Sequence, residues 1–300
     1  MVIVKKKVVR KKTYYYLEHS IRKGKKVEKK EVYLGSKTPS TIEEIKKDFL
    51  DGINKEKWYH DADRIKERYS KEQRRTPKSV REKELQNFAT KFTFDTQRIE
   101  GSTLTHRETA NLLEKGITPK NKPVRDVKEA ESHRDLFYEI LKPEKDISFQ
   151  EILDWHWKLF HVTKPDIAGK IRKYQVAISG SKFIPPLAVE VYPMLTEFFK
   201  WYNKNKNKLH PLELAAISHL KFVTIHPFGD GNGRISRLVM NFILYRKKYP
   251  MLDILYQERN SYYNALERSQ LRKLDRTFVQ WFVKKYIKEY KKYLIEIAKS

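Results

Sequence analysis

Two helical patterns separated by a short glycine-rich loop constrain the fold of this chain more than any other feature. Residues 212–225 follow Pro211 and are apolar on most sides, which predicts a central buried helix. Residues 234–247 place apolar side chains on one stripe at helical spacing, and Pro250 ends that pattern. Three of the 10 glycines lie within five residues of the loop between the two patterns. A mainly α fold built around this helix pair is therefore expected.

The loop is suited to binding an anion. Gly231 and Gly233 can adopt the backbone angles of an anion-binding turn, and they let phosphate oxygens approach the first N–H groups of the following helix. Arg234 and Arg237 are three residues apart, so both guanidinium groups lie near one face of that helix. A polyphosphate is the ligand that this combination favours.

Two other side chains of the loop add chemistry to this anion site. Asp230 offers hard oxygen ligands beside the phosphates, which suits Mg²⁺. His226 ends the first helix, where an imidazole can act as a general base near neutral pH.

Other motifs do not fit the spacing. No Lys-Ser or Lys-Thr pair follows the glycines, as a P-loop requires. An EF-hand loop beginning at Asp230 would need Gly and Glu where Ile235 and Asn241 stand. His219 and His226 do not have a zinc-protease spacing, and the absence of Cys excludes thiol catalysis and Cys-ligated zinc. A plain helix-turn-helix with a glycine corner remains as the structural alternative.

The loop meets every fixed position of the signature His-x-Phe-x-Asp/Glu-Gly-Asn-Gly-Arg-x-x-Arg, and over about residues 85–285 the chain resembles the Fic family. The matching residues are His226, Phe228, Asp230, Gly231, Asn232, Gly233, Arg234 and Arg237. The resemblance implies a Fic-type helical core with a β-hairpin flap. It also implies a protein adenylyltransferase, a nucleotidyltransferase that moves AMP from ATP onto a Ser, Thr or Tyr hydroxyl of a target protein.

The same resemblance assigns roles to the loop residues. His226 would accept the proton of the target hydroxyl, and Asp230 would hold Mg²⁺. The backbone amides from Gly231 through Asn232 to Gly233 would hold the α-phosphate region of ATP. Arg234 and Arg237 would hold the β- and γ-phosphates.

A second expected element is a β-hairpin over residues 172–186, which we call the flap. Ser179-Gly180-Ser181 predicts its turn. By resemblance, Val176 and Ile178 belong to the flap that aligns a target segment by strand addition. The alternative is a hairpin that only covers the core.

The resemblance also places an adenine-side helix near residues 258–266. Tyr263 is expected to stack on or bond with the adenine, and Gln270, two helical turns later, to contact its edge. Ordinary helix positions remain the alternative for both residues.

Glu100 is expected to be inhibitory. Thr96-Gln-Arg-Ile-Glu100-Gly101 resembles the Fic inhibitory motif Ser/Thr-x-x-x-Glu-Gly/Asn, at the end of a predicted helix over about 85–101. The resemblance implies that Glu100 pairs with Arg237 and keeps the γ-phosphate from its catalytic position. Two alternatives stay open: a surface glutamate at the helix end, and a hydrolase in which Glu100 orients a water that removes AMP.

The chain is divided by sequence into a basic β-meander over 1–37, a charged helical linker over 38–77 and a Fic domain over 78–300. Residues 1–37 hold 13 Lys and Arg against 3 Glu, so +10 of the net charge of +26 lies there. A nucleic-acid partner is one explanation, which makes a nucleic-acid-associated regulator an alternative function, and a solvated basic face is the other. The oligomeric state stays open, with a homodimer as one alternative.

Turn signals divide the N-terminal segment into three β-rich runs at 2–9, 13–22 and 26–34. Gly24 is predicted to turn the chain after the second run, and Gly35 to close the third. The chain has no secretory signal at its start and no apolar run near the roughly 20 residues of a membrane span, so a cytoplasmic protein without a membrane partner is expected.

Overall fold

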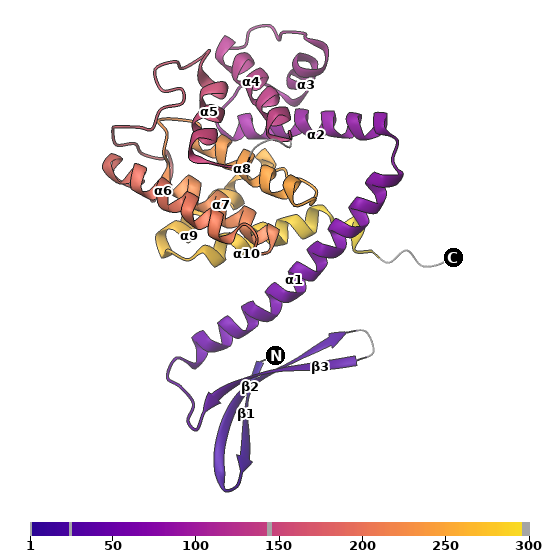
Figure 1. Ribbon diagram of the computed structural model, residues 1–300, viewed down its shortest axis with the longest axis vertical. Helices are drawn as coiled ribbons and strands as arrows, with labels where there is room; N and C mark the ends of the chain where they lie inside the picture. Colours follow the sequence, from indigo (N-terminus) through magenta and orange to yellow (C-terminus); the bar gives the residue numbers. More distant parts are fainter. Residues whose placement is uncertain (1, 24–25, 143–145, 296–300) are drawn as a thin grey trace. The chain divides into compact units, whose positions relative to one another are not determined.

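A computed structural model describes residues 2–23, 26–142 and 146–295, and it is mainly α-helical with one small sheet (Figure 1). The elements are β1 (Val2–Val9), β2 (Lys12–Lys23), β3 (Lys26–Gly35), α1 (Ile42–Arg75), α2 (Lys78–Ile99), α3 (His106–Lys115), α4 (Val124–Ile140), α5 (Phe149–Phe160), α6 (Ala188–Asn205), α7 (Pro211–Ile225), α8 (Asn232–Arg246), η1 (Tyr256–Glu258), α9 (Arg259–Arg272), α10 (Asp275–Glu289) and η2 (Lys291–Tyr293). Among the described residues, none of these helices is long and apolar enough to cross a membrane.

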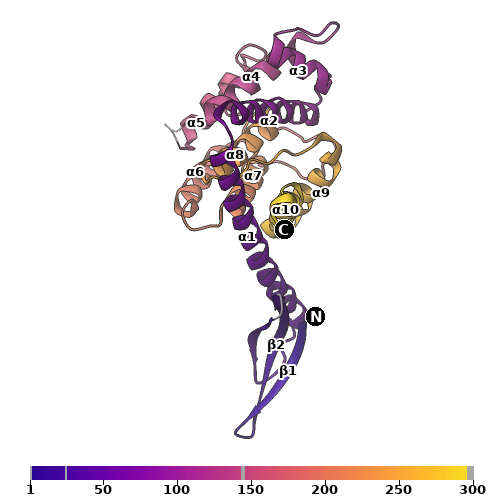
Figure 2. The same ribbon diagram turned by 90° about the vertical axis from the view of Figure 1, so that its right-hand side faces the viewer.

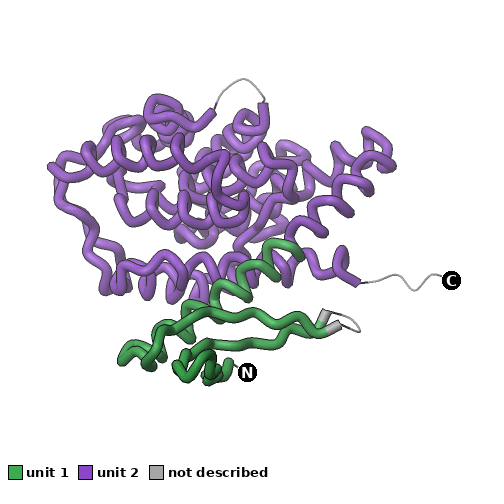
Figure 3. The backbone as a smooth tube through the Cα atoms, turned by 60° about the horizontal axis from the view of Figure 1, so that its bottom comes forward, with its two compact units in different colours: residues 1–61 green, residues 62–300 purple. Residues whose placement is uncertain are grey.

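The chain forms two compact units, Met1–Asp61 and Ala62–Ser300, which divide inside α1 (Figure 3). The boundaries expected from sequence, after residues 37 and 77, do not coincide with this division. Residues 62–77 of the expected linker therefore belong to the larger unit, in which Ala62 and Ile65 are fully buried.

The smaller unit contains the predicted three-stranded meander, with strand order β1-β2-β3 and antiparallel pairing throughout. Leu17 of β2 is fully buried, and on the same face Lys30 of β3 forms an ion pair of 3.0 Å with Glu56 of α1. The first half of α1 therefore covers this face of the sheet. The third strand ends at Gly35, as expected, whereas the turn predicted at Gly24 lies outside the described residues.

The centre of the larger unit is the pair α7 and α8, as the sequence predicted (Figures 1 and 2). Helices α6 and α10 pack against α7, whereas α2, α4 and α5 pack against α8. Pro211 occupies the first turn of α7, and the His210 side chain accepts a hydrogen bond from the Leu212 N–H at 3.2 Å. These contacts begin a largely buried helix directly before the glycine-rich loop.

The flap differs from the expected β-hairpin. A turn is present, with the Ser181 N–H donating to the Ile178 carbonyl at 3.1 Å, but residues 172–186 contain no strand. Pro185 and Pro186 have no N–H and therefore cannot donate to a ladder. Arg172 instead joins the two arms, because its side chain donates to carbonyl oxygens in both. The prediction of paired strands here was wrong.

Candidate active site

The glycine-rich loop is closed by its own side chains. The Asn232 amide group accepts from the Phe228 N–H and donates to the Phe228 carbonyl, each at 2.9 Å. Gly231 has φ 81°, and a Cβ there would lie 2.3 Å from the Phe160 ring. The Asn232 side chain thus holds the loop, so a phosphate contact at this position would come from its backbone N–H at the start of α8.

His156 of α5 packs against the glycine-rich loop. Its ring stacks on Phe228 at a centroid distance of 3.7 Å. Its Nδ1 accepts from the Gly169 N–H at 2.9 Å, so Nε2 carries the proton and donates to the Asp230 carbonyl at 3.0 Å. Burial lowers the pKa of His156 to about 4, which keeps this neutral form. His156 is a positioning residue that joins the loop to the chain just before the flap.

The ring of His226, the predicted general base, is held by a hydrogen bond to the end of α7. His226 caps α7 in the left-handed conformation, with φ 51°. Its Nδ1 lies 3.2 Å from the Val223 carbonyl, which can only accept, so the proton is on Nδ1 and Nε2 has a lone pair. Burial lowers the pKa of His226, the bond to Val223 raises it, and the Arg172 guanidinium lowers it; the net shift is downward. The imidazole is therefore neutral at pH 7.

Arg172 holds the backbone of this base. Its Nε donates to the His226 carbonyl at 2.8 Å, and its backbone N–H donates to Pro227 at 3.0 Å. Nη1 and Nη2 donate to the carbonyls of Tyr174 and Pro186, at 3.0 and 2.6 Å. One buried guanidinium therefore connects both arms of the flap with the predicted catalytic histidine.

Asp230, the predicted metal ligand, is surrounded by cations. Lys164 Nζ lies 2.5 Å from its Oδ2, and Arg234 Nη2 lies 2.9 Å from its Oδ1. Burial alone would raise the pKa of the Asp230 carboxyl, but the Arg234 guanidinium and the Lys164 ammonium lower it far below its ordinary value. Asp230 is thus ionised at any physiological pH.

Arg234 is fixed inside the protein. Besides Asp230, its guanidinium forms a buried ion pair with Glu129 of α4 and donates to Gln97 Oε1 of α2 at 3.2 Å. Its position over the Phe160 ring, 4.5 Å from the centroid, adds a cation–π contact. In this structure the predicted phosphate ligand therefore organises the Asp230 carboxylate and ties α8 to α2 and α4.

Arg237 meets the predicted inhibitory residue. Its Nη2 lies 2.6 Å from Glu100 Oε1, and Nε donates to Thr96 Oγ1 at 3.3 Å. A Cβ at Gly233 would lie 2.3 Å from the same Glu100 oxygen. The end of α2 is held in place by the left-handed Gly101, with φ 93°. The Glu100 carboxylate thus lies against the first turn of α8, in the expected anion site.

The remaining predicted site residues lie around this centre. The Tyr263 hydroxyl donates to the Ile99 carbonyl at 3.1 Å, and Gln270 Nε2 donates to Thr224 Oγ1 at 3.2 Å. Tyr263 therefore contacts the end of α2, and Gln270 the end of α7. Val176 and Ile178 are half-buried in the first arm of the flap. The adenine-side role of Tyr263 and Gln270 stays a prediction.

Sequence reasoning did not select several residues that shape this site. They are Thr96, Gln97, Glu129, His156, Lys164, Arg172 and Tyr262. Thr96 and Gln97 lie in the inhibitory motif, Arg172 begins the flap and Tyr262 lies in the adenine-side segment, but no such role was assigned to them from sequence. No spacing rule connects Glu129, His156 and Lys164 with the loop, because they lie on separate helices and turns.

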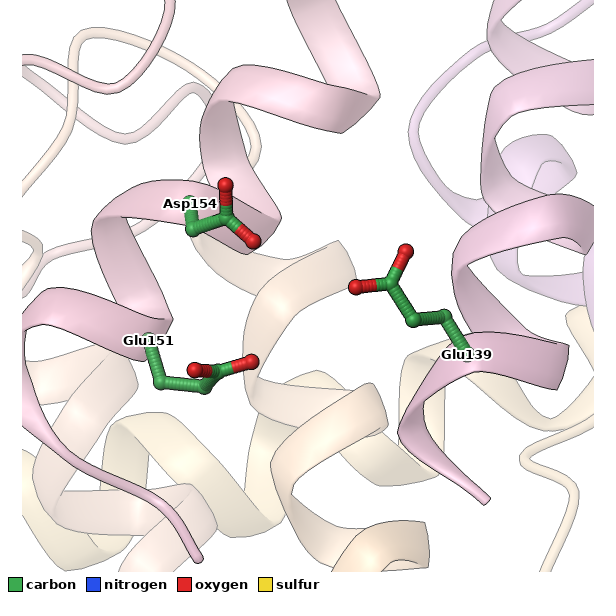
Figure 4. Close-up of side chains that lie close together, drawn as sticks. All are labelled: Glu139, Glu151 and Asp154. Atoms are coloured by element: carbon green, nitrogen blue, oxygen red, sulfur yellow. The ribbon is translucent and has the colours of Figure 1, made fainter. Parts of the chain in front are cut away.

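A separate group of carboxylates lies between α4 and α5. Oxygen atoms of Glu139, Glu151 and Asp154 are within 4.8 Å of one another (Figure 4). Lys158 Nζ forms an ion pair with Asp154 at 2.7 Å and another with Glu139, and Glu151 accepts from Trp155 Nε1 at 3.2 Å. Because protein cations and donors already serve these oxygens, we assign no metal site to them.

Comparison with known proteins agrees with the fold and the loop. Residues 146–244 match the family model Fic/DOC family, so the chain carries a Fic domain. It is 35% identical over 199 residues to "Protein adenylyltransferase fic-1" of Caenorhabditis briggsae, which is 64% of this chain and 39% of the relative. It is also 35% identical over 174 residues to "Protein adenylyltransferase Fic" of Drosophila melanogaster, covering 56% of this chain and 35% of that protein.

Solved structures show the same architecture. The structure "Fic-1 (aa134 - 508) from C. elegans" superposes with a TM-score of 0.74 at 26% identity, over 85% of this chain and 76% of that one. A Fic domain containing signaling protein from Bacteroides thetaiotaomicron has a TM-score of 0.68 at 27% identity, over 77% of this chain and 95% of that one. The chain spans only about 39% of the curated relative's length, so it shares with it the Fic domain rather than the whole protein.

Proposed function

We propose that this protein is an adenylyltransferase that moves AMP from ATP to a hydroxyl group of a target protein, and that Glu100 inhibits it. The observation that carries the proposal is the Glu100 carboxylate, which lies 2.6 Å from Arg237 at the N-terminus of α8. The Glu100 carboxylate thus occupies the helix N-terminus where a phosphate is expected. His226, whose Nε2 is available as a base, precedes this helix by a few residues. The names of the curated relatives support the same activity.

In the proposed reaction, the target hydroxyl oxygen attacks the α-phosphorus of ATP. The hydroxyl proton moves to His226 Nε2, a new P–O bond forms to the target, and the bond between the α- and β-phosphates breaks to release pyrophosphate. The Nδ1–H bond to the Val223 carbonyl orients the ring for this transfer. The bond from Arg172 to the His226 carbonyl holds the backbone of the base.

The start of α8 would stabilise the negative charge. N–H groups of its first turn have no partner within the helix, and its dipole favours an anion there. Arg237 would meet the terminal phosphates when Glu100 leaves, because it is the guanidinium to which Glu100 is bound. Charge that develops on the leaving pyrophosphate would be neutralised by groups already in place.

The residues fit a magnesium ion at Asp230. This carboxylate stays ionised and its side chain is 37% exposed, and Lys164, one of the two cations that contact it, is itself partly exposed. Bound Mg²⁺ would neutralise phosphate charge and orient the pyrophosphate leaving group. Lys164 contacts Oδ2 of the Asp230 carboxylate and Arg234 contacts Oδ1. These two ion pairs fix the position of the predicted metal ligand.

The inhibition can be tested with a single substitution. In Glu100→Gly, Arg237 has no internal carboxylate partner, so α-labelled ATP with Mg²⁺ should give a steep rise in label transferred to the protein itself or to proteins of a host lysate. Removing the misalignment can release several kcal/mol of barrier, which is on the order of 10²-fold or more in rate. Glu67→Gly, at an exposed residue of α1, is the matched control and should not raise transfer.

The alternative hydrolase predicts the opposite outcome. A premodified target carrying labelled AMP should lose its label with the wild-type protein and keep it with Glu100→Gly if Glu100 orients the water. An increase in transfer, without a loss of AMP removal, supports the transferase. No increase in labelled product, with ATP bound normally, shows that Glu100 is not inhibitory.

A further inference from the structure

The smaller unit has an exposed sheet face with an unusual combination of side chains. Residues opposite each other in the register share a face, so Tyr14, Tyr16 and Tyr33 lie on the side of the sheet away from Leu17. Tyr33 lies between the other two rings, with centroids 6.1 Å from Tyr14 and 5.2 Å from Tyr16. We call this side, with its neighbouring cations, the tyrosine face.

The tyrosine face is accessible. Tyr33 is 55% exposed, and Tyr14 and Tyr16 are half-buried. The rings are tilted by 52° and 49° to Tyr33 rather than stacked on it. Ring surface therefore remains available to a planar ligand.

Cations surround these rings. The register places Lys5, Lys7, Lys12, Arg22 and Lys29 on the same face. Two carboxylates, Glu18 and Glu31, share it and pair with Lys5 at 2.7 Å and Lys7 at 2.5 Å. The face still has more cations than anions, and Lys7 lies 4.4 Å from the centre of the Tyr16 ring. A negatively charged partner with planar rings fits both properties.

The turn between β1 and β2 adds a second, independent observation. Val9 pairs with Lys12, so Arg10 and Lys11 form a two-residue turn, and both have positive φ, 46° and 63°. Such turns favour Asn and Gly, since other residues are strained there. Two cations thus stand where the backbone disfavours them, next to a third at Lys12. Strain of this kind is commonly found at functional positions.

We infer that the tyrosine face binds single-stranded nucleic acid, with bases stacking on Tyr33 and Tyr14 and the phosphates meeting the cations of the face and of the 10–11 turn. Aromatic rings on an open sheet accept unpaired bases of any sequence, and the surrounding cations neutralise the backbone. A duplex would keep its bases stacked internally and gain only the charge contacts. This activity is separate from the proposed AMP transfer and needs no nucleotide triphosphate.

The test uses the full chain and labelled RNA and DNA oligonucleotides of about 12 nucleotides, single-stranded and duplex, in fluorescence anisotropy titrations without ATP. Tyr33→Ala should weaken single-strand binding by about 5- to 100-fold, the usual effect of losing one stacked base. Tyr33→Phe retains a ring and should restore binding. Tyr192→Ala removes a similarly exposed tyrosine of α6 and should leave binding unchanged.

A second variant separates charge from folding. Arg10→Asn with Lys11→Gly gives the turn its preferred residues, so the sheet should be at least as stable. Binding should nevertheless weaken, and the slope of log K against log salt should become shallower by about 1.4 if each lost cation meets one phosphate of a single strand.

Three results would overturn the inference. Tyr33→Ala could bind the single strand as tightly as the wild type; a duplex could bind as tightly as the single strand; or the protein could bind vesicles containing phosphatidylserine while failing to bind any oligonucleotide. The last result would assign the face to an anionic membrane. His226→Ala should bind oligonucleotides normally, which keeps this test independent of the proposed enzyme activity.

Discussion

The two arginines of α8 are three residues apart, yet their surroundings differ. Arg234 is held by Glu129, whose side chain is 6% exposed, and by Asp230 and Gln97. Arg237 is held by Glu100, whose side chain is 24% exposed and lies just beyond the end of α2. The Glu129 carboxylate is buried and is also bound by Lys164 and Thr163, whereas the Glu100 carboxylate at a helix end can turn to water. We therefore call Arg234–Glu129 the fixed pair, because it is expected to persist, and Arg237–Glu100 the releasable pair.

The largest expected effect comes from replacing His226, the proposed base. His226→Ala should reduce transfer by about 10²–10⁴-fold. If Glu100 acts only by displacing the phosphate, Glu100→Gly should no longer raise transfer once His226 is also replaced by Ala. The nucleotide is aligned in that background, but the base is missing. Labelled transfer and ATP binding should be measured together on the single and double variants. Near-normal transfer by the double variant would show that another group takes the proton.

The fixed pair should matter more for stability than the releasable one. Glu129→Ala leaves the buried Arg234 without its core partner and should cost about 3–5 kcal/mol of unfolding free energy. Glu100→Ala should cost less, because Arg237 keeps its contacts with Thr96 and Tyr262 and gains access to water. Urea unfolding with and without ATP is the measurement, and ATP should stabilise Glu100→Ala more than wild type. Equal losses for both variants would remove the distinction.

The pH dependence tests whether the base is independent of the releasable pair. The proposed reaction needs neutral His226, and burial lowers the pKa of this imidazole below the usual value of about 6.5. The activity of Glu100→Gly should therefore be constant from neutral pH downward to below pH 6.5, and fall only as the pH drops through the lowered pKa. Measuring kcat/KM of Glu100→Gly over this pH range tests the expectation. An acid limb centred above pH 6.5 would mean that the ring is not neutral in the free enzyme.

The smallest expected effect concerns the attachment of the inhibitory helix. Tyr263→Phe removes the hydroxyl that donates to Ile99 and keeps the ring. A neutral hydrogen bond contributes about 0.5–1.5 kcal/mol, so the released state should become a few-fold more populated and basal transfer should rise by that factor. The KM for ATP should not change if the ring alone contacts adenine. Tyr192→Phe, at an exposed residue of α6, is the control.

Much of this arrangement is local in sequence and was predicted. The helix before the loop, the loop and the helix after it are consecutive, so periodicity and glycine spacing were enough to find them. Glu100 was found because a short motif precedes a helix-ending glycine. Glu129, His156 and Lys164 had no such signal, since only the packing of α4, α5 and the following turn brings them to the loop.

The flap shows the opposite case, in which a local signal was misleading. Ser179-Gly180-Ser181 correctly predicted a turn, but a turn does not determine whether its arms pair. Pro185 and Pro186 have no N–H to donate to a strand ladder. The Arg172 side chain donates to the carbonyl oxygens of Tyr174 and Pro186, one in each arm, which a ladder would otherwise use. The arms therefore stay unpaired because of side chains at the ends of the flap, and the turn signal alone does not contain that information.

The close contact between Glu100 and Gly233 has a quantitative consequence. Because Glu100 is attached to the same chain as the site it fills, it competes with phosphate as a tethered ligand. Its effective concentration is about millimolar for a flexible tether, and a stiff helix such as α2 can hold it at the site more effectively. The inhibited fraction would then depend on the free ATP concentration and on the rigidity of one helix, and no diffusible inhibitor would be required. Mutations that merely loosen α2 would shift that balance without altering any atom of the site.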